Sequence, residues 1–273
     1  MPPVPSRNLA PDKPGRSPAN RSLERGVEIL RSFRPGSELL GNAELAERTG
    51  LSKSTVSRLT QTLVGMGLLQ LDACTRSYGL AAPVLSLAHA FRSGSTALGI
   101  AAPLMRKASQ ARQINVGMAA ADRDEMVYLE SIRYNRRPSL RTVVSGQRVP
   151  MALTSLGRAY LSTVEPARRE LLLAHFQRER RSRWAQLKLD LQTSFRAVAE
   201  KGYCAAAWQP EVVALATPLS FRGVSYALNV SVSSDEALEQ VERELAPVLM
   251  DLKRSIQMGL DNADDAFETA SSR

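Results

Sequence analysis

Residues 42–72 read NAELAERTGLSKSTVSRLTQTLVGMGLLQLD, and this stretch decides the fold of the N-terminal part of the chain. A short helix is predicted over about 42–49, after which Gly50 supplies the left-handed residue of a tight turn. A longer helix is predicted over about 53–66, and Gly67 ends it. Two helices joined by a short glycine-containing turn form the helix-turn-helix arrangement.

The second of these helices has two chemically different faces. At about 100° per residue, Val56, Leu59 and Leu63 lie together on one face, which is expected to pack on the core. The opposite face carries hydroxyl, amide and guanidinium groups instead of the Glu and Lys of an ordinary exposed helix. These groups match the edges of base pairs, and the free N–H groups at the helix start can bind a phosphate. The sequence therefore predicts DNA contacts at Ser52, Lys53, Ser54, Thr55, Ser57, Arg58 and Gln61.

The segments around these two helices complete a winged helix-turn-helix. An amphipathic helix is predicted over 22–33, before the pair. Two short extended pieces follow the pair at 68–72 and 77–80, joined by a polar tip that contains Arg76. In this fold the third helix enters the major groove and the wing reaches the backbone or the minor groove. Arg76 is therefore a further predicted DNA contact.

The rest of the chain alternates between helices and strands, which predicts an α+β domain with a sheet. Helices are expected near 98–113, 155–162, 166–176, 188–201 and 235–259, and strands near 115–120, 126–133, 140–144, 212–218 and 226–233. The predicted organisation is a flexible tail at 1–19, a winged helix-turn-helix domain at 20–82, a linker helix at 83–96, an effector-binding domain at 97–259 and a second flexible tail at 260–273.

Composition narrows the possible functions. The 36 Lys and Arg against 27 Asp and Glu give a net charge of +9, which favours a polyanionic partner such as nucleic acid. No apolar run is long enough to span a membrane and no signal peptide is recognisable, so a cytoplasmic protein without membrane contact is expected.

The sequence gives little support for a metal site, a cofactor or an enzymatic activity. With two cysteines and two histidines, the chain has no Cys/His cluster at zinc-ligand spacing and no disulfide framework, so neither a metal site nor a cofactor is expected. No nucleophile elbow, P-loop or dinucleotide fingerprint is present, and an enzyme is not expected. A nonspecific architectural DNA-binding protein and a winged-helix regulator of another family remain the alternative readings.

Several ordered motifs resemble one family, the IclR-type transcriptional regulators. The N-terminal motifs are NRSLERGVEILRSF at 20–33, the stretch quoted above and YGLAAPVLSLA at 78–88. VPMALTSLGRAYL at 149–161 resembles the opening of a helix in the family's effector-binding domain, and later landmarks lie at 201–203, 216–219 and 227–232.

The resemblance implies a homodimer or tetramer that binds a pseudo-palindromic operator in double-stranded DNA. It also implies a GAF-like C-terminal domain with a pocket for a small organic effector, and repression as the commoner behaviour. Thr154-Ser155 with Gly157-Arg158, and the 228–232 variant, are similar to the branch that controls the catabolism of aromatic acids. The chain departs from the family at Ala206 and Ala214, where an aspartate and a cysteine are common near the ligand.

Effector-binding residues are predicted from strand alternation together with this resemblance. Asn229 and Ser231 share the polar face of their strand, which the resemblance turns toward the ligand. Thr154 and Ser155 begin a helix and are expected to hold a carboxylate, with Met151 and Leu153 as apolar walls. For each polar residue, a helix cap or an ordinary strand position is the alternative. Further candidates are Arg133, Arg141 and Arg148 for the carboxylate, and Tyr203 and Trp208 for an aromatic ring.

Overall fold

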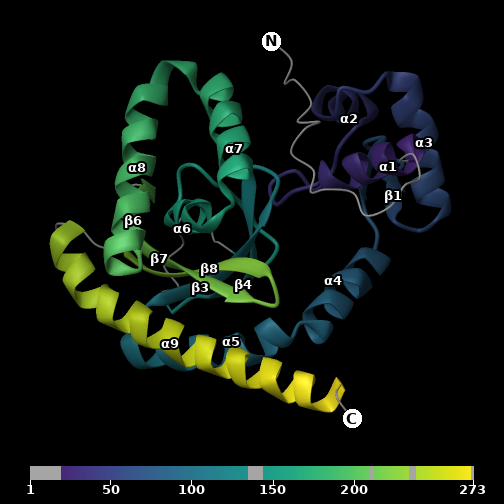
Figure 1. Cartoon of the computed structure of the whole chain (residues 1–273). Helices are drawn as coiled ribbons and strands as arrows, with labels where there is room; N and C mark the ends of the chain where they lie inside the picture. The colour runs from purple at the N-terminus through teal and green to yellow at the C-terminus, as the bar shows by residue number, and fades with distance from the viewer. Residues whose placement is uncertain (1–19, 135–143, 210–211, 234–237, 272–273) are drawn as a thin grey trace. The chain divides into compact units, whose positions relative to one another are not determined.

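The computed structural model describes residues 20–134, 144–209, 212–233 and 238–271. The chain forms two compact units, 1–94 and 95–273, and each has its own hydrophobic core (Figure 1). None of the helices in these ranges is long and apolar enough to cross a lipid bilayer.

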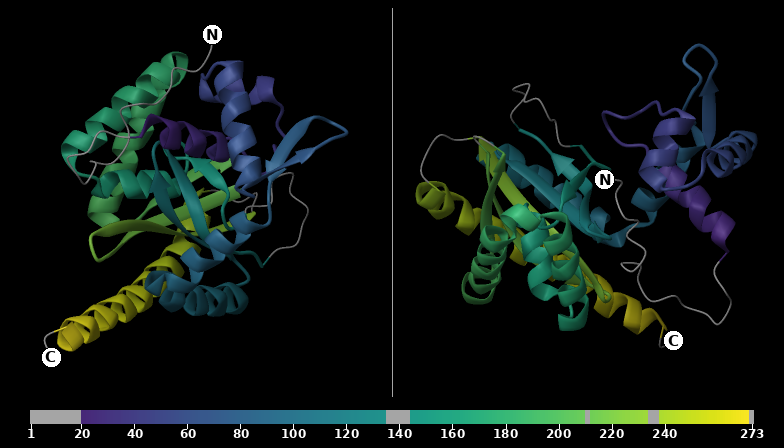
Figure 2. Two further views of the ribbon diagram at one scale, coloured as in Figure 1. Left: turned by 90° about the vertical axis from the view of Figure 1, so that its right-hand side faces the viewer. Right: turned by 90° about the horizontal axis from the view of Figure 1, so that it is seen from above.

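The first unit is a winged helix-turn-helix. Its elements are α1 (Arg21–Arg31), α2 (Asn42–Thr49), α3 (Lys53–Gly65), β1 (Leu69–Asp72), β2 (Ser77–Leu80) and α4 (Pro83–Gly94). The apolar faces of α1, α2 and α3 meet at Ile29, Leu45 and Val56, each fully buried. Strands β1 and β2 pair antiparallel, and their hairpin protrudes from the helices in both views of Figure 2.

Local capping sets the turn between α2 and α3. Gly50 ends α2 in the left-handed conformation with φ of 68°, which glycine adopts without a steric penalty. Two residues later, the Ser52 hydroxyl caps α3 by accepting a hydrogen bond from the Thr55 N–H at 3.3 Å. The start and direction of α3 therefore follow from residues that the sequence itself identifies.

The second unit is built on a six-stranded sheet. Its elements are α5 (Thr96–Arg112), β3 (Asn115–Asp122), β4 (Glu125–Ile132), β5 (Arg148–Pro150), α6 (Ser155–Thr163), α7 (Pro166–Glu179), the short 3₁₀ turn Arg181–Arg183, α8 (Trp184–Lys201), β6 (Cys204–Gln209), β7 (Val212–Phe221), β8 (Val224–Ser233) and α9 (Leu238–Ser271). The strand order is β5-β4-β3-β8-β7-β6 and every pair is antiparallel. Helices α5 and α9 cover one face of this sheet, and α6 lies on the other with α8 packed against it (Figure 1).

The helices and strands match the predicted α+β class, with two strands that the sequence reading did not predict. Strand β5 has only three residues, and β6 begins in the small-residue run after Gly202, where neither alternation nor β-branched residues mark a strand. Of the strand predicted near 140–144, residues 140–143 lie outside the described residues.

At the C-terminus the structure has the extension of the last helix that the sequence allowed as the alternative to a tail. A flexible tail was expected over 260–273, but α9 continues to Ser271. Leu260 is fully buried, so the apolar face does not end at Gly259. Beyond it, the Arg222 guanidinium at the β7–β8 turn pairs with Asp264 at 2.7 Å and lies 4.2 Å from the Phe267 ring. The polar composition of residues 260–271 did not indicate these contacts, because their partner, Arg222, lies in a turn that is distant in the sequence.

Gly157 allows the start of α6 to lie against the preceding loop, which offers a test of this packing. A Cβ at Gly157 would overlap the backbone of Met151, whereas a Cβ at Gly99, in α5, meets nothing within 4 Å. We expect Gly157→Ala to destabilise the second unit by about 1–3 kcal/mol through overpacking.

Gly99→Ala is the matched control, because it should stabilise α5 by about 0.5–1 kcal/mol. Both tryptophans, Trp184 and Trp208, lie in the second unit, so urea unfolding followed by tryptophan fluorescence reports on this unit. Equal midpoints for Gly157→Ala and the parent protein would contradict the close approach.

Candidate functional site

The residues predicted to contact DNA lie on the outer face of α3 and at its start. Ser52, Lys53, Ser54, Arg58 and Gln61 are exposed, and Thr55 and Ser57 are half-buried. Val56 and Thr60 point inward and are fully buried. The Ser52 hydroxyl also lies 3.1 Å from that of Ser54 and 2.9 Å from that of Thr55. The helix thus begins with a cluster of hydroxyl groups on its solvent side.

The three basic residues predicted to contact DNA are not paired with acidic side chains in the part of the chain that the structure describes. Lys53, Arg58 and Arg76 form no ion pair within the described ranges. The first turn of α3 contains no acidic residue, whereas the first turn of α2 contains Glu44. The N–H groups at the start of α3 and these side chains are therefore available to an anion.

The tip of the wing is shaped by its own backbone. The Asp72 carboxylate accepts hydrogen bonds from the N–H groups of Cys74 at 2.8 Å and Thr75 at 3.2 Å. These bonds, from Thr75 first and then Cys74, lower the pKa of Asp72 below its ordinary value. Arg76 follows in the left-handed conformation with φ of 53° and is exposed.

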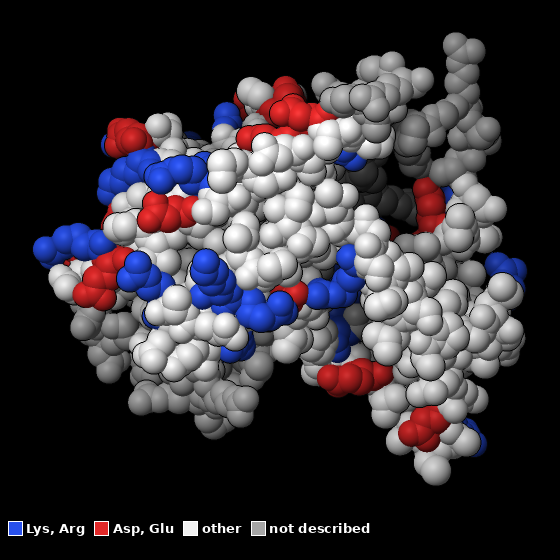
Figure 3. Space-filling model, turned by 90° about the horizontal axis from the view of Figure 1, so that it is seen from below, with Lys and Arg blue, Asp and Glu red and all other residues white. Residues whose placement is uncertain are grey.

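Positive charge is not confined to this unit. On the face shown in Figure 3, Lys and Arg side chains form a band, and most Asp and Glu lie toward its margins. Exposed cations include Arg106 and Lys107 on α5 and Arg178 on α7. Positive charge alone therefore does not distinguish α3; its exposed hydroxyl, amide and guanidinium groups, in a helix without an acidic residue, do.

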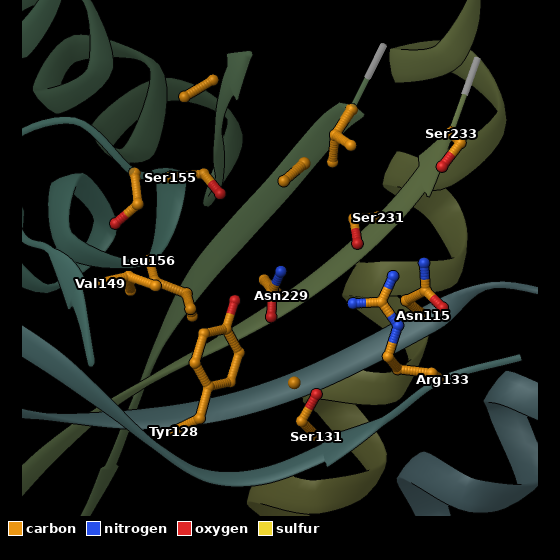
Figure 4. Close-up of a pocket in the computed structure, with 15 residues that line it drawn as sticks. Asn115, Tyr128, Ser131, Arg133, Val149, Ser155, Leu156, Asn229, Ser231 and Ser233 are labelled. Carbon is orange, nitrogen blue, oxygen red and sulfur yellow. The ribbon is translucent and has the colours of Figure 1, made fainter. Parts of the chain in front are cut away.

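A pocket lies in the second unit between the sheet and the start of α6 (Figure 4). It is lined by Asn115, Gly117, Tyr128, Ser131, Arg133, Val149, Thr154, Ser155, Leu156, Ala206, Val212, Ala214, Asn229, Ser231 and Ser233. Four of the six predicted effector-binding residues are among them: Thr154, Ser155, Asn229 and Ser231.

Strand register explains why these residues meet. Gly117 is paired with Asn229 across β3 and β8, and Ser231 is paired with Asn115 on one side and Ala214 on the other. Residues directly opposite one another share a face of the sheet, so this row of small and polar residues lies on the pocket side. Their neighbours along the strands, such as Val116 and Val230, are buried on the other face against α5 and α9.

Asn229 and Tyr128 form the polar centre of the pocket. Burial raises the pKa of the Tyr128 hydroxyl to about 12. A hydrogen bond with the Asn229 side chain and the charge of Arg133 lower this pKa, but by less than burial raises it. The other side of the same amide is unsatisfied, because the buried Asn229 Oδ1 has no hydrogen-bond partner within the described residues. A buried acceptor without a donor is costly, so this atom favours a ligand that donates a hydrogen bond.

Gly117 provides the space in which Asn229 and Tyr128 meet. A Cβ on Gly117 would overlap the Tyr128 ring and crowd Asn229 Oδ1. Only glycine leaves room for this arrangement.

The start of α6 is the second polar feature of the pocket, and Thr154 is its cap, which is the alternative role that the sequence left open. The Thr154 hydroxyl is already used, since it donates to the Pro150 carbonyl at 3.0 Å and accepts from the Gly157 N–H at 3.2 Å. The N–H groups of Ser155 and Leu156 find no acceptor among the described residues. They are the free donors that a helix start offers to an anion.

Of the three arginines proposed for a carboxylate, one lines the pocket. Arg133 lies at its edge beside Asn115 and forms no ion pair within the described part of the chain (Figure 4). Arg148 is held by Asp122 and Glu125 and is therefore not available. Arg141 lies outside the described residues.

The remaining candidates do not line the pocket. Met151 is fully buried behind α6, and Leu153 is half-buried outside the pocket. Tyr203 donates a hydrogen bond to Glu242 at 3.0 Å, and the side chain of Trp208 is not among those described. The sequence reading missed Tyr128, Gly117 and Asn115, although the alternation along 115–120 could have placed the last two on the face of Asn229.

Together these features define a class of protein: a DNA-binding regulator that joins a winged helix-turn-helix to a second domain with a small-molecule pocket. Residues 22–73 match the family model of the IclR helix-turn-helix domain, and residues 95–258 match that of the bacterial transcriptional regulator IclR C-terminal domain. The chain therefore belongs to the IclR family of transcriptional regulators, as the sequence motifs predicted.

Individual relatives agree with this assignment. The regulator TsaQ1/TsaQ2 of Comamonas testosteroni is 36% identical over 186 residues, which span 67% of this chain and 66% of that protein. The Pca regulon regulatory protein of Pseudomonas putida is 29% identical over 86% of this chain and 82% of its own length.

Solved structures share the fold. An IclR family regulator from Brucella abortus superposes with a TM-score of 0.80 at 32% identity, over 89% of this chain and 93% of that one. An IclR homolog from Microbacterium hydrocarbonoxydans, solved in complex with 4-hydroxybenzoate, has a TM-score of 0.64 at 23% identity, over 88% and 99% of the two chains.

Proposed function

We propose that α3 reads a pseudo-palindromic operator and that a small organic acid, bound in the second unit, changes the affinity for this DNA. The observation that carries the proposal is the outer face of α3, where hydroxyl, amide and guanidinium groups are exposed without acidic partners. Arg58 is suited to donate two hydrogen bonds to a guanine, with Ser57 and Gln61 beside it. Lys53, Arg76 and the N–H groups at the start of α3 are suited to phosphates.

Loss of Arg58 or Ser57 should reduce discrimination between operator and unrelated DNA. We expect Arg58→Ala to cost about 1–3 kcal/mol on the operator and much less on unrelated DNA, because a base contact is lost. The operator is sought upstream of the gene itself or of its neighbour, and affinity is measured by fluorescence anisotropy on both DNAs.

Two arginine variants serve as comparisons. Arg76→Ala should weaken binding to both DNAs alike and reduce the salt slope by about 1, as expected for a phosphate contact. Arg196→Ala removes an exposed guanidinium of α8 in the second unit and should change neither. Full discrimination in both Arg58→Ala and Ser57→Ala would show that another surface reads the DNA.

A second copy of the chain is proposed to cover α4, which supports the homodimer. No residue of α4 is buried within one chain. Val84, Leu87 and Phe91 follow one another at helical spacing, and the side chains of Leu87 and Phe91 are 62% and 55% exposed. A two-fold dimer through this stripe would present two α3 helices to two half-sites, which matches a pseudo-palindromic operator.

A charged side chain in this apolar stripe of α4 should dissociate the proposed dimer. We expect Phe91→Asp to shift the protein toward the monomer in sedimentation velocity, because an apolar contact would have to bury a carboxylate. Leu85 lies on the opposite side of the same helix and is 75% exposed, so Leu85→Asp is the matched control. A dimer that survives both substitutions would place the contact elsewhere.

The pocket supports an acid that also carries a hydroxyl group. The free N–H groups of Ser155 and Leu156 would bind the carboxylate, and Arg133 would add positive charge nearby. Asn229 Oδ1 would accept a hydrogen bond from the hydroxyl. 4-Hydroxybenzoate, the ligand of the Microbacterium protein, combines these two groups and serves as the probe.

Ligand binding is tested by thermal shift on the full chain with 4-hydroxybenzoate, benzoate, 4-hydroxybenzamide and an aliphatic acid. We expect 4-hydroxybenzoate to bind roughly two- to tenfold more tightly than benzoate, since one hydrogen bond contributes about 0.5–1.5 kcal/mol. Asn229→Ala combined with Ser231→Ala should remove this preference.

Arg133→Gln should weaken the binding of the acids but not that of the neutral 4-hydroxybenzamide. Arg196→Gln, which removes an exposed guanidinium of α8, should change the binding of neither. A preference for 4-hydroxybenzoate over benzoate that persists in the Asn229→Ala, Ser231→Ala double variant would place the contact of the ligand hydroxyl elsewhere. Operator affinity with and without the bound acid then gives the direction of regulation.

A further inference from the structure

A group of three potential metal ligands lies away from the pocket. Asp124 is at the turn between β3 and β4, and His175 and Glu179 are one helical turn apart on α7. Asp124 and His175 are 51 positions apart in the chain. None of the three lines the effector pocket.

The distances between the ligand atoms are compatible with a metal site, since all three ligand atoms lie within 4.8 Å of one another. His175 Nε2 lies 3.4 Å from Asp124 Oδ2 and 3.3 Å from Glu179 Oε1. Charge-assisted N–H···O bonds are normally about 2.7–2.9 Å long, and one ring N–H cannot point at two carboxylates at once. In a tetrahedral zinc site with bonds of about 2.05 Å, neighbouring ligand atoms lie about 3.3 Å apart.

The neighbouring acids are paired elsewhere, which leaves Asp124 and Glu179 to His175, while the cations Arg123 and Arg178 precede them directly in the chain. Asp122 and Glu125, which flank Asp124 in the turn, are both paired with Arg148. Within the described residues, Asp124 and Glu179 have no ionic partner other than His175. Two carboxylates therefore share one imidazole, which leaves the group with excess negative charge.

Burial increases from one side of the group to the other. The side chain of His175 is 11% exposed, that of Asp124 29% and that of Glu179 50%. Three protein ligands with one open side leave a position for water, as in zinc sites that keep a free coordination position. One imidazole with two carboxylates suits Zn²⁺ better than Mg²⁺, which prefers oxygen ligands alone.

We propose that Asp124, His175 and Glu179 bind a divalent transition-metal ion, with Zn²⁺ as the fitting one, and that the ion ties the β3–β4 turn to α7. The sequence contains no Cys and His at ligand spacing and therefore predicts no metal. It does not reveal this site, because one of the carboxylates comes from a turn that only the tertiary fold brings to α7.

Isothermal titration of the tag-free, full-length protein with ZnCl₂ tests the site. We expect one Zn²⁺ per chain, together with a rise in the thermal midpoint, since an ion that binds only the folded chain stabilises it. His175→Ala should weaken binding by at least about tenfold, and Asp124→Asn and Glu179→Gln, which keep the side-chain shapes, should each weaken it as well.

The chain contains only one other histidine, which makes the control simple. His89 is exposed on α4, and His89→Ala should bind Zn²⁺ like the parent protein. MgCl₂ should produce no comparable heat. Circular dichroism establishes that each variant is folded, and the two amide variants keep the test valid if His175→Ala is not.

Three outcomes would overturn the proposal: no zinc binding by the parent protein, binding that survives His175→Ala and Asp124→Asn, or binding that depends on His89. In the first case the three side chains form only a polar contact between the β3–β4 turn and α7. All three outcomes are independent of DNA and effector binding.

Discussion

The antiparallel pairing of β3 with β8 is the constraint on which the second unit depends. Because side chains alternate along each strand, the register that buries Val116 and Val230 against α5 and α9 also places Gly117 opposite Asn229 on the other face. A shift by one residue would exchange the two faces, putting polar groups into the core and apolar groups into the pocket. The hydrophobic effect that stabilises the sheet therefore also positions the polar residues that line the pocket.

The first unit follows the same logic on a helix. Burial of Val56 and Leu63 fixes the rotation of α3, and the rotation decides which residues stay outside. The cap at Ser52 then fixes where the helix starts, and with it the position of the free N–H groups beside Lys53. Neither feature needs a partner molecule to form, so the exposed face of α3 is organised before any DNA is bound.

Sequence periodicity predicted the parts of this protein that depend on local order. The three helices of the first unit, the face of α3 and the polar face of β8 all follow from spacing along one element. Asn229 and Ser231 lie in the pocket for this reason, and Ser155 lies there because it begins a helix. Tyr128, in contrast, reaches the pocket through strand pairing, which a single sequence does not specify.

The same difference explains which contacts a single sequence does not reveal. Thr154 was read as a ligand donor, but its hydroxyl is occupied by Pro150 and Gly157, and only the fold shows both partners. The helical end at 260–271 is stabilised by Arg222 from a remote turn, and the group around His175 is completed by Asp124 in the same way.

Gly117 gives the protein an unusual genetic property under the proposed function. A single nucleotide change at this codon would introduce a Cβ that overlaps the Tyr128 ring and lies 2.5 Å from Asn229 Oδ1, so these pocket residues would have to move, in a unit separate from the helix-turn-helix. Such alleles would still occupy the operator but would ignore the inducing or co-repressing metabolite. A population could thus lock the regulated genes in one state by one heritable step, and reverse it by another.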